Sequence, residues 1–249
     1  MTTRRDFLSA SLGAFALYAL VGEAARARAG APFDTAAWIR RHDAIAKALA
    51  AGELAPLAWQ REVEALARGI DVAALAAHVA ASEQRAVGNG MPSDPQKRLV
   101  WFRDASGARV NAHYGAALFR FGRDDVITPH GHRHMVSAHL VIEGRLRVRN
   151  YDRVGDEDGA MLLRPTRDAA LGVGDVSTMS SARDNVHWFV PASGVATTFD
   201  VIVGDLTPGA PSYVIEAVDP LAAERRADGT LRAPIITFAA ASVKYAAGD

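Results

Sequence analysis

The most informative stretch of the sequence is Thr128-Pro129-His130-Gly131-His132-Arg133-His134. Alternate residues of an extended strand face the same way, so the three histidines are expected to point together into one cavity. Two imidazoles two residues apart on a strand can chelate one metal ion, with each ring nitrogen about 2.0–2.1 Å from it. Three buried imidazoles would each need a polar partner, which is unusual for an ordinary core strand. The alternative interpretation is a histidine-rich surface loop.

The residues after position 95 carry the pattern of a β-rich domain. Short runs of β-forming residues lie at 99–103, 109–114, 117–121, 136–142, 146–151, 161–163, 186–190 and 197–203, with 235–238 as one more. Turn residues separate them, including Gly144, which follows His132 by twelve residues at the end of an apolar run. Many short strands with regular turns predict a barrel or sandwich. Residues 205–233, rich in Pro, Gly and Ala, are predicted to be irregular.

Residues 33–87 are predicted to form about three helices. Apolar residues recur there at spacings of three and four, as in Trp38, Ile45 and Leu49, and alanine is abundant. The breaker-rich stretch 88–95 then reads as a linker. His42 and His78 lie on these helices, where a buried or surface histidine is a better interpretation than a metal ligand.

Composition limits the classes of function. The 249 residues contain 28 basic and 28 acidic side chains, so the chain lacks the basic character of a nucleic-acid binder. The chain has no cysteine, which excludes disulfides, thiolate ligands and cysteine nucleophiles. Any metal must therefore be held by nitrogen and oxygen ligands.

The histidine stretch resembles the first motif of the cupins, which are small β-barrels of the double-stranded β-helix or jelly-roll type. The motif consists of a glycine, His-x-His, an acidic residue and a second glycine, and these places are taken here by Gly122, His130, His132 and Gly144. The usual acidic ligand would fall near Ser137, which cannot replace a carboxylate. The second cupin motif implies a further histidine, His187, in a strand that follows Gly174-Asp175. The implied metal site is His130, His132 and His187, without a carboxylate.

Within the cupins, the chain resembles the thiol dioxygenases, specifically the cysteamine dioxygenase and plant cysteine oxidase branch. The resemblance rests on Pro129-His130-Gly131-His132, the step to Gly144, Arg149-Asn150-Tyr151-Asp152 and Asn185-Val186-His187-Trp188-Phe189. It implies Fe(II) on three histidines, a small thiol and O2 as substrates, and helices before the barrel. Cupins often pair through their sheets, so the resemblance also allows a homodimer. The same ligands suit Zn, Ni, Mn or Cu. Another cupin metalloenzyme (an isomerase, a lyase or another dioxygenase) and a non-catalytic periplasmic binding protein are alternatives, because fold alone does not choose a function.

Five further residues are candidates for the site. His134 is interpreted as a proton carrier beside the ligands or as a solvent-exposed histidine at the rim. His139 either lines the pocket or fills a polar niche. Arg120 and Arg149 lie on predicted strands, where one arginine is expected to bind a substrate carboxylate. Tyr151 is expected to donate a proton or hydrogen bond near the metal, and the alternative for each of these three is a solvated surface position.

The first residues predict a signal peptide, residues 1–29. Arg4 and Arg5 precede Asp6, Phe7 and Leu8, an apolar stretch follows, and Ala27-Arg28-Ala29 has the small-x-small pattern of a cleavage site. This order is typical of twin-arginine export, so a periplasmic protein without stable membrane association after cleavage is expected. The alternative is an uncleaved anchor. The predicted organisation is then 30–95 for the helical region with its linker and 96–249 for the cupin barrel with an irregular C-terminal extension.

Overall fold

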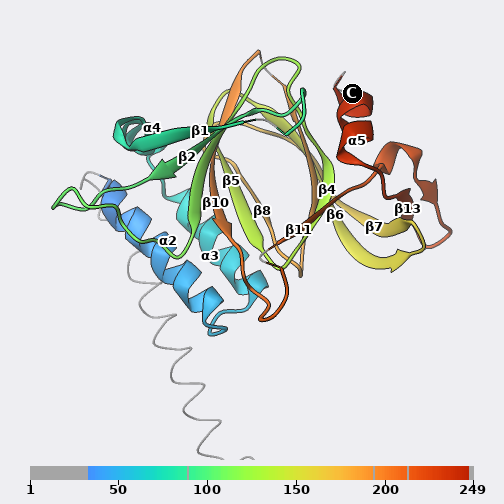
Figure 1. Cartoon of the computed structure of the whole chain (residues 1–249), viewed down its shortest axis with the longest axis horizontal. Helices are drawn as coiled ribbons and strands as arrows, with labels where there is room; N and C mark the ends of the chain where they lie inside the picture. Colours follow the sequence, from blue (N-terminus) through green and yellow to red (C-terminus); the bar gives the residue numbers. More distant parts are fainter. Residues whose placement is uncertain (1–32, 89, 193, 212, 247–249) are drawn as a thin grey trace, which may run out of the picture. The chain divides into compact units, whose positions relative to one another are not determined.

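Two antiparallel sheets enclose the interior of the domain (Figure 1). The six-stranded sheet contains, in spatial order, β1 (Glu83–Val87), β2 (Gln96–Trp101), β3 (Gly115–Phe121), β10 (Ala196–Val203), β5 (Val136–Glu143) and β8 (Val176–Met179). The seven-stranded sheet contains β11 (Val214–Ala217), β4 (Ile127–Arg133), β9 (Val186–Pro191), β6 (Leu146–Glu157), β7 (Ala160–Leu171), β13 (Leu231–Pro234) and β12 (Glu224–Arg225). This arrangement is a cupin-type double-stranded β-helix, so the predicted fold class is confirmed.

The computed structural model describes residues 33–88, 90–192, 194–211 and 213–246. The described residues from Thr35 onward form one compact unit. The predicted signal peptide, residues 1–29, lies outside the described residues. Within the described ranges, no helix combines the length and the hydropathy needed to span a membrane.

In the described part of the chain, three helices precede the barrel, as the sequence predicts: α2 (Thr35–Ala50), α3 (Pro56–Arg68) and α4 (Val72–Ala81). They pack on the outer face of the six-stranded sheet, where the ring centroids of Trp38 and Phe199 are 6.1 Å apart. Alternation along β10 turns Phe199 toward the helices and its neighbour Asp200 toward the barrel interior. The helices therefore cover one side of a sheet whose other side forms the wall of the central cavity.

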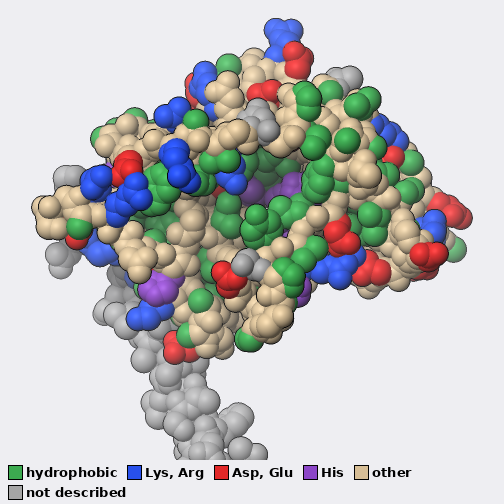
Figure 2. All heavy atoms as spheres, in the orientation of Figure 1, with side chains coloured by type: hydrophobic (Ala, Val, Ile, Leu, Met, Phe, Trp, Pro, Cys, Tyr) green, Lys and Arg blue, Asp and Glu red, His purple; other side chains and the backbone are tan. Residues whose placement is uncertain are grey.

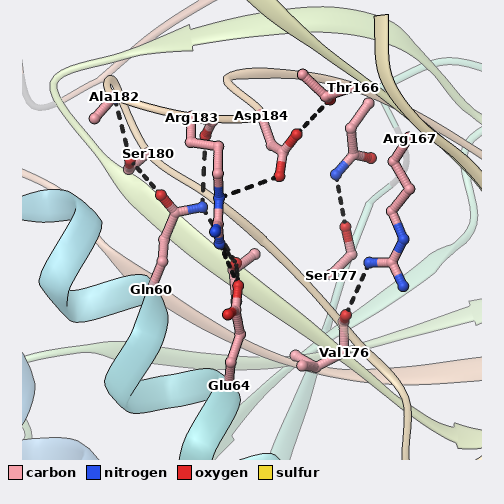
Figure 3. Close-up of polar contacts among 12 residues, drawn as sticks. Gln60, Glu64, Thr166, Arg167, Val176, Ser177, Ser180, Ala182, Arg183 and Asp184 are labelled. Atoms are coloured by element: carbon pink, nitrogen blue, oxygen red, sulfur yellow. Dashed lines mark hydrogen bonds and ion pairs between the residues drawn. The ribbon is translucent and has the colours of Figure 1, made fainter.

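Polar contacts fix α3 to the turn between β8 and β9 (Figure 3). Gln60 is fully buried, and its amide oxygen accepts a 2.7 Å hydrogen bond from the Ser180 hydroxyl. Its amide nitrogen donates to Thr178 Oγ1 at 3.2 Å. Glu64, one helical turn later, accepts a 2.7 Å hydrogen bond from Thr178 and forms an ion pair with Arg183. This network holds the turn that leads directly into the strand carrying His187.

Replacing Gln60 with leucine is expected to lower the free energy of unfolding by about 1–3 kcal/mol, because the buried Ser180 hydroxyl loses its acceptor. Leucine has nearly the same volume as glutamine, so the loss of stability reports the missing polar contacts and not a cavity. Urea unfolding followed by circular dichroism measures the change. Replacing Gln96 with leucine, an exposed glutamine on β2, is the matched control and should leave the midpoint unchanged. An unchanged midpoint for the Gln60 variant would contradict this role.

The secondary structure differs from the predictions in several places. Residues 83–87, which belong to the predicted helical region, form strand β1 because they pair with β2. Residues 109–114 form no strand and contribute only the isolated bridge between Arg103 and Arg109, because this segment is largely exposed and has no neighbouring strand along its length. Residues 235–238 are not a strand either; β13 ends at Pro234 and helix α5 (Phe238–Tyr245) starts at Phe238. Residues 205–233 contain β11, β12 and most of β13, with a short 3-10 helix, η1 (Pro220–Ala222), between them. β11 pairs with β4 and β13 pairs with β7, and both partners lie far away in sequence; β12 pairs with β13.

Candidate metal centre

The three predicted ligands come from two neighbouring strands. His130 on β4 is paired directly with His187 on β9, and His132 lies two residues further along β4, on the same face. The pairing of β4 with β9 changes register after Ile127 and before His130. Pro129 lies in this interval and has no N–H with which to form an inter-strand hydrogen bond. This local irregularity lets the Thr128 carbonyl turn toward the His130 ring.

The hydrogen bonds of the rings select the nitrogens that are left for a metal. His130 donates from Nδ1 to the Thr128 carbonyl at 2.7 Å, so its Nε2 carries the lone pair. His132 Nδ1 lies 3.2 Å from the Met135 sulfur, which can only accept a hydrogen bond. Nδ1 therefore carries the proton, and Nε2 of His132 carries the lone pair. His187 Nδ1 is buried and has no hydrogen-bond partner among the described residues. His187 Nε2 faces His132 Nε2 at 3.2 Å.

The three rings converge on one point. Their centroids are 4.5, 4.7 and 4.9 Å apart, and one ligand nitrogen from each ring lies within 4.8 Å of the others. Two nitrogens that bind the same ion at about 2.0–2.1 Å are themselves roughly 3–3.4 Å apart in octahedral or tetrahedral geometry. The 3.2 Å between His132 and His187 already meets this requirement. Small rotations of the rings bring the third nitrogen into the same shell, so the residues fit a metal ion.

Burial keeps the three imidazoles neutral. It lowers the pKa of His130 to about 4, with the nearby imidazole of His139 acting in the same direction. Burial, followed by the neighbouring histidines, lowers the pKa of His132 and of His187 well below 6.5. Only a neutral imidazole has a lone pair for a metal, so the site is prepared for a cation at neutral pH.

Gly131, between the two ligands of β4, explains the spacing of the motif. It faces away from the cavity, and a Cβ atom at this position would lie 3.2 Å from Val186 and 3.4 Å from the Met161 sulfur. A side chain there would push β4 away from the core and move both flanking histidines. Gly144 serves the fold in a different way: its φ of 71° forms the β5–β6 turn, as the sequence predicts.

A second polar group lies beside the three ligands. His139 donates from Nδ1 to Asp200 Oδ2 at 2.6 Å, and its Nε2 is 2.9 Å from the Ser137 hydroxyl. Asp200 is fully buried on β10, directly opposite His139 on β5, and its second carboxylate oxygen has no partner among the described residues. The ring centroids of His139 and His187 are 5.0 Å apart. His139 therefore lines the cavity, and its position is fixed by Asp200, a carboxylate that sequence reasoning missed.

These groups lie at the floor of a cavity of about 530 Å³. Figure 2 shows the hollow from its open side, with hydrophobic side chains around it and histidines visible inside. The apolar side chains that line it are Val87, Met91, Phe119, Ile127, Met135, Ile202, Tyr213, Ile215 and Phe238. A volume of this size accommodates a small organic molecule and suits a binding site.

The structure does not bring His134 or Tyr151 into this cavity. Strand β4 ends at Arg133, so alternation stops there; His134 has a φ of 64° and its Nδ1 contacts the Thr207 hydroxyl at 2.9 Å. Tyr151 lies on the other face of β6, packed against Met161 and Val186, and burial raises the pKa of its hydroxyl. Asn150, one residue earlier, is the residue of β6 that faces the interior, where it pairs with His187 in the sheet and donates to Ser177.

Neither predicted substrate-binding arginine lines the cavity. The Arg149 guanidinium stacks over the Trp188 ring, 3.9 Å from its centroid, and also contacts Asp168. Arg120 forms an exposed ion pair with Glu143 at 2.9 Å. Both side chains lie on the outward face of their strands. Among the described lysines and arginines, the one that lines the cavity is Lys97, on β2, which the sequence analysis did not single out.

Comparison with solved structures returns proteins of the double-stranded β-helix type. A vicilin from Solanum melongena is 16% identical with a TM-score of 0.33, over 43% of this chain and 26% of the vicilin. KdgF from a Halomonas species is 17% identical with a TM-score of 0.33, over 46% of this chain and 82% of KdgF. A protein with a double-stranded β-helix domain from Klebsiella pneumoniae is 14% identical with a TM-score of 0.32, over 51% of this chain and 83% of its own length. The chain thus covers about a quarter of the vicilin. No protein-family model matches the chain, and no curated protein matches it.

Proposed function

We propose that the protein is a metal-dependent dioxygenase that binds Fe(II) on His130, His132 and His187 and oxidises a small molecule with O2. The observation that carries the proposal is the convergence of three neutral imidazoles at the floor of an apolar cavity. Fe(II) held by three uncharged ligands would supply redox chemistry with O2, open coordination positions and a positive charge that favours an anionic substrate group.

The residues of the chain would supply orientation and a dry environment. Phe119, Ile127 and Phe238 line the cavity and would exclude water from the reacting groups. The Asp200 carboxylate holds the Nδ1 proton of His139, which leaves Nε2 of that ring directed at the Ser137 hydroxyl. This pair is placed to accept or return a proton at His139 Nε2 beside the ligands.

A small thiol is the first substrate class to test. The proposal of a thiol rests on the resemblance of the segments around His130 and His187 to the thiol dioxygenases. In addition, a thiolate is an anionic ligand that a ferrous ion would hold close to O2. Export by the twin-arginine pathway remains a proposal from residues 1–29, and secretion of a reporter fused to them would test it separately.

Oxygen uptake tests the proposed reaction. The full chain, loaded anaerobically with Fe(II), is expected to consume O2 when cysteamine, cysteine or 3-mercaptopropionate is added, whereas a variant with His130, His132 and His187 changed to alanine is not. An oxygen electrode and mass spectrometry of the products measure consumption and the number of oxygen atoms added. Retention of the metal without oxygen uptake, for thiols and for other small molecules, would contradict the dioxygenase and leave a metal-binding cupin of another kind.

A further inference from the structure

The cavity wall carries a cationic side chain in addition to the three histidines. Among the residues that the structure describes, Lys97 is the one lysine or arginine that lines the cavity. It lies on β2 opposite Phe119 of β3, and its ammonium nitrogen is 5.2 Å from the centroid of that ring. The side chain is half-buried. Part of its hydration is therefore already lost, which favours an anionic partner.

The protein itself does not supply that partner. Within the described ranges, no carboxylate forms an ion pair with Lys97, whereas Arg120 on the neighbouring strand β3 faces Glu143. Asp94 also lines the cavity; its Oδ2 accepts the backbone N–H of Met91 at 2.8 Å, and it forms no ion pair with Lys97. Lys97 is thus a cation at the cavity wall whose charge is left for a ligand.

The side chains of the cavity wall indicate the chemical character of the rest of that ligand. Between Lys97 and the histidines the lining is dominated by apolar side chains such as Phe119, Ile202 and Ile215. A molecule that fills this space must be largely apolar and carry an anionic group at the Lys97 side. We propose that Lys97 binds the carboxylate of an otherwise apolar small acid, and that this acid is the class of substrate the cavity takes. The proposal deepens the proposed function, but the contact with Lys97 needs no metal.

Calorimetric titration of the metal-free full chain with octanoate and with 1-octanol tests this inference. Both probes have the same apolar body, so the difference between their affinities reports the carboxylate. Octanoate is expected to bind more tightly than 1-octanol. Lys97→Gln is expected to weaken octanoate binding about 10- to 100-fold, the value of a hydrogen bond to a charged group, and to leave 1-octanol binding unchanged. Lys97→Arg should retain most of the preference for octanoate.

Arg98→Gln is the matched control. Arg98 follows Lys97 on β2, points to the opposite face and donates to Gln84 at 2.9 Å, so its loss should not change either affinity. Three results would overturn the proposal: equal affinity for both probes, equal weakening of both by Lys97→Gln, or octanoate binding that requires the metal. Because the titration uses metal-free protein, failure of the oxygenase activity would not affect its outcome.

Discussion

The change of His187 to alanine is expected to weaken metal binding by more than about 100-fold, which exceeds the 10- to 100-fold effect typical of groups that only orient a ligand. His187 contributes the nitrogen that lies 3.2 Å from His132 Nε2. His139 is the neighbouring imidazole, but its two ring nitrogens already contact Asp200 and Ser137. Titration with Co(II), followed by its visible absorption at pH 7, gives the dissociation constant. The colour also reports the number of nitrogen ligands.

The matched control for this change is His134→Ala. His134 lies closer in sequence to the ligand pair than His187 does, yet its ring contacts Thr207 outside the cavity. Its removal should leave the dissociation constant unchanged. Equal weakening by the two variants would mean that the metal is held elsewhere or that His134 joins the site, and either result would contradict the geometry described above.

Acid is expected to destabilise the metal-free protein through His42. This histidine on α2 is 2% exposed, both of its ring nitrogens lack partners among the described residues, and burial lowers its pKa from 6.5 to about 3. Its ring packs against Trp38, with centroids 4.1 Å apart. Protonation in the folded state would place an unpaired charge between the helices and the sheet.

The sign of the effect follows from the two pKa values of His42. The unfolded chain takes up the proton below pH 6.5 and the folded chain only near pH 3, so stability falls as the pH falls through this window. Between pH 6.5 and pH 4 the loss from His42 is about 3 kcal/mol. His42→Leu removes this loss. Between pH 6.5 and pH 4, the free energy of unfolding of the variant should therefore rise relative to that of the wild type by about 3 kcal/mol.

Urea unfolding at a series of pH values, with EDTA present, measures this difference. EDTA keeps the buried metal ligands in the same metal-free state in both proteins, so their own titration cancels. His78→Leu, which removes a partly exposed histidine from α4, controls for the loss of a histidine as such. A constant difference between His42→Leu and wild type from pH 7 to pH 4 would show that His42 does not carry the acid sensitivity.

The sequence predicts most of the site because its pattern is local. His130 and His132 are alternate residues of β4, and Gly144 follows the next strand along the chain, β5, so strand alternation and turn chemistry, which both act over short sequence distances, place these residues. His187 was reached through the resemblance to the second cupin motif, and the structure pairs it directly with His130. The helices before the barrel follow from apolar spacing and alanine content.

The remaining features depend on contacts that sequence spacing does not encode. Asp200 meets His139 only because β10 lies beside β5, and β11 becomes a strand only because it completes the edge next to β4. Alternation also fails where a strand ends, which is why His134 leaves the site after Arg133. Arg149 and Tyr151 lie on a strand, as predicted, but the sequence does not show which face of β6 lines the interior, since both faces of that strand carry polar residues.

The most direct test of the central claim is the metal content of the full chain after anaerobic loading with Fe(II) and removal of excess metal. Elemental mass spectrometry would compare the wild type with a variant in which His130, His132 and His187 are alanine. A control variant loses three histidines that lie outside the site, His78, His113 and His134. One equivalent of metal is expected in the wild type and the control, and none in the first variant. Equal metal content in all three proteins, or none in the wild type, would contradict it.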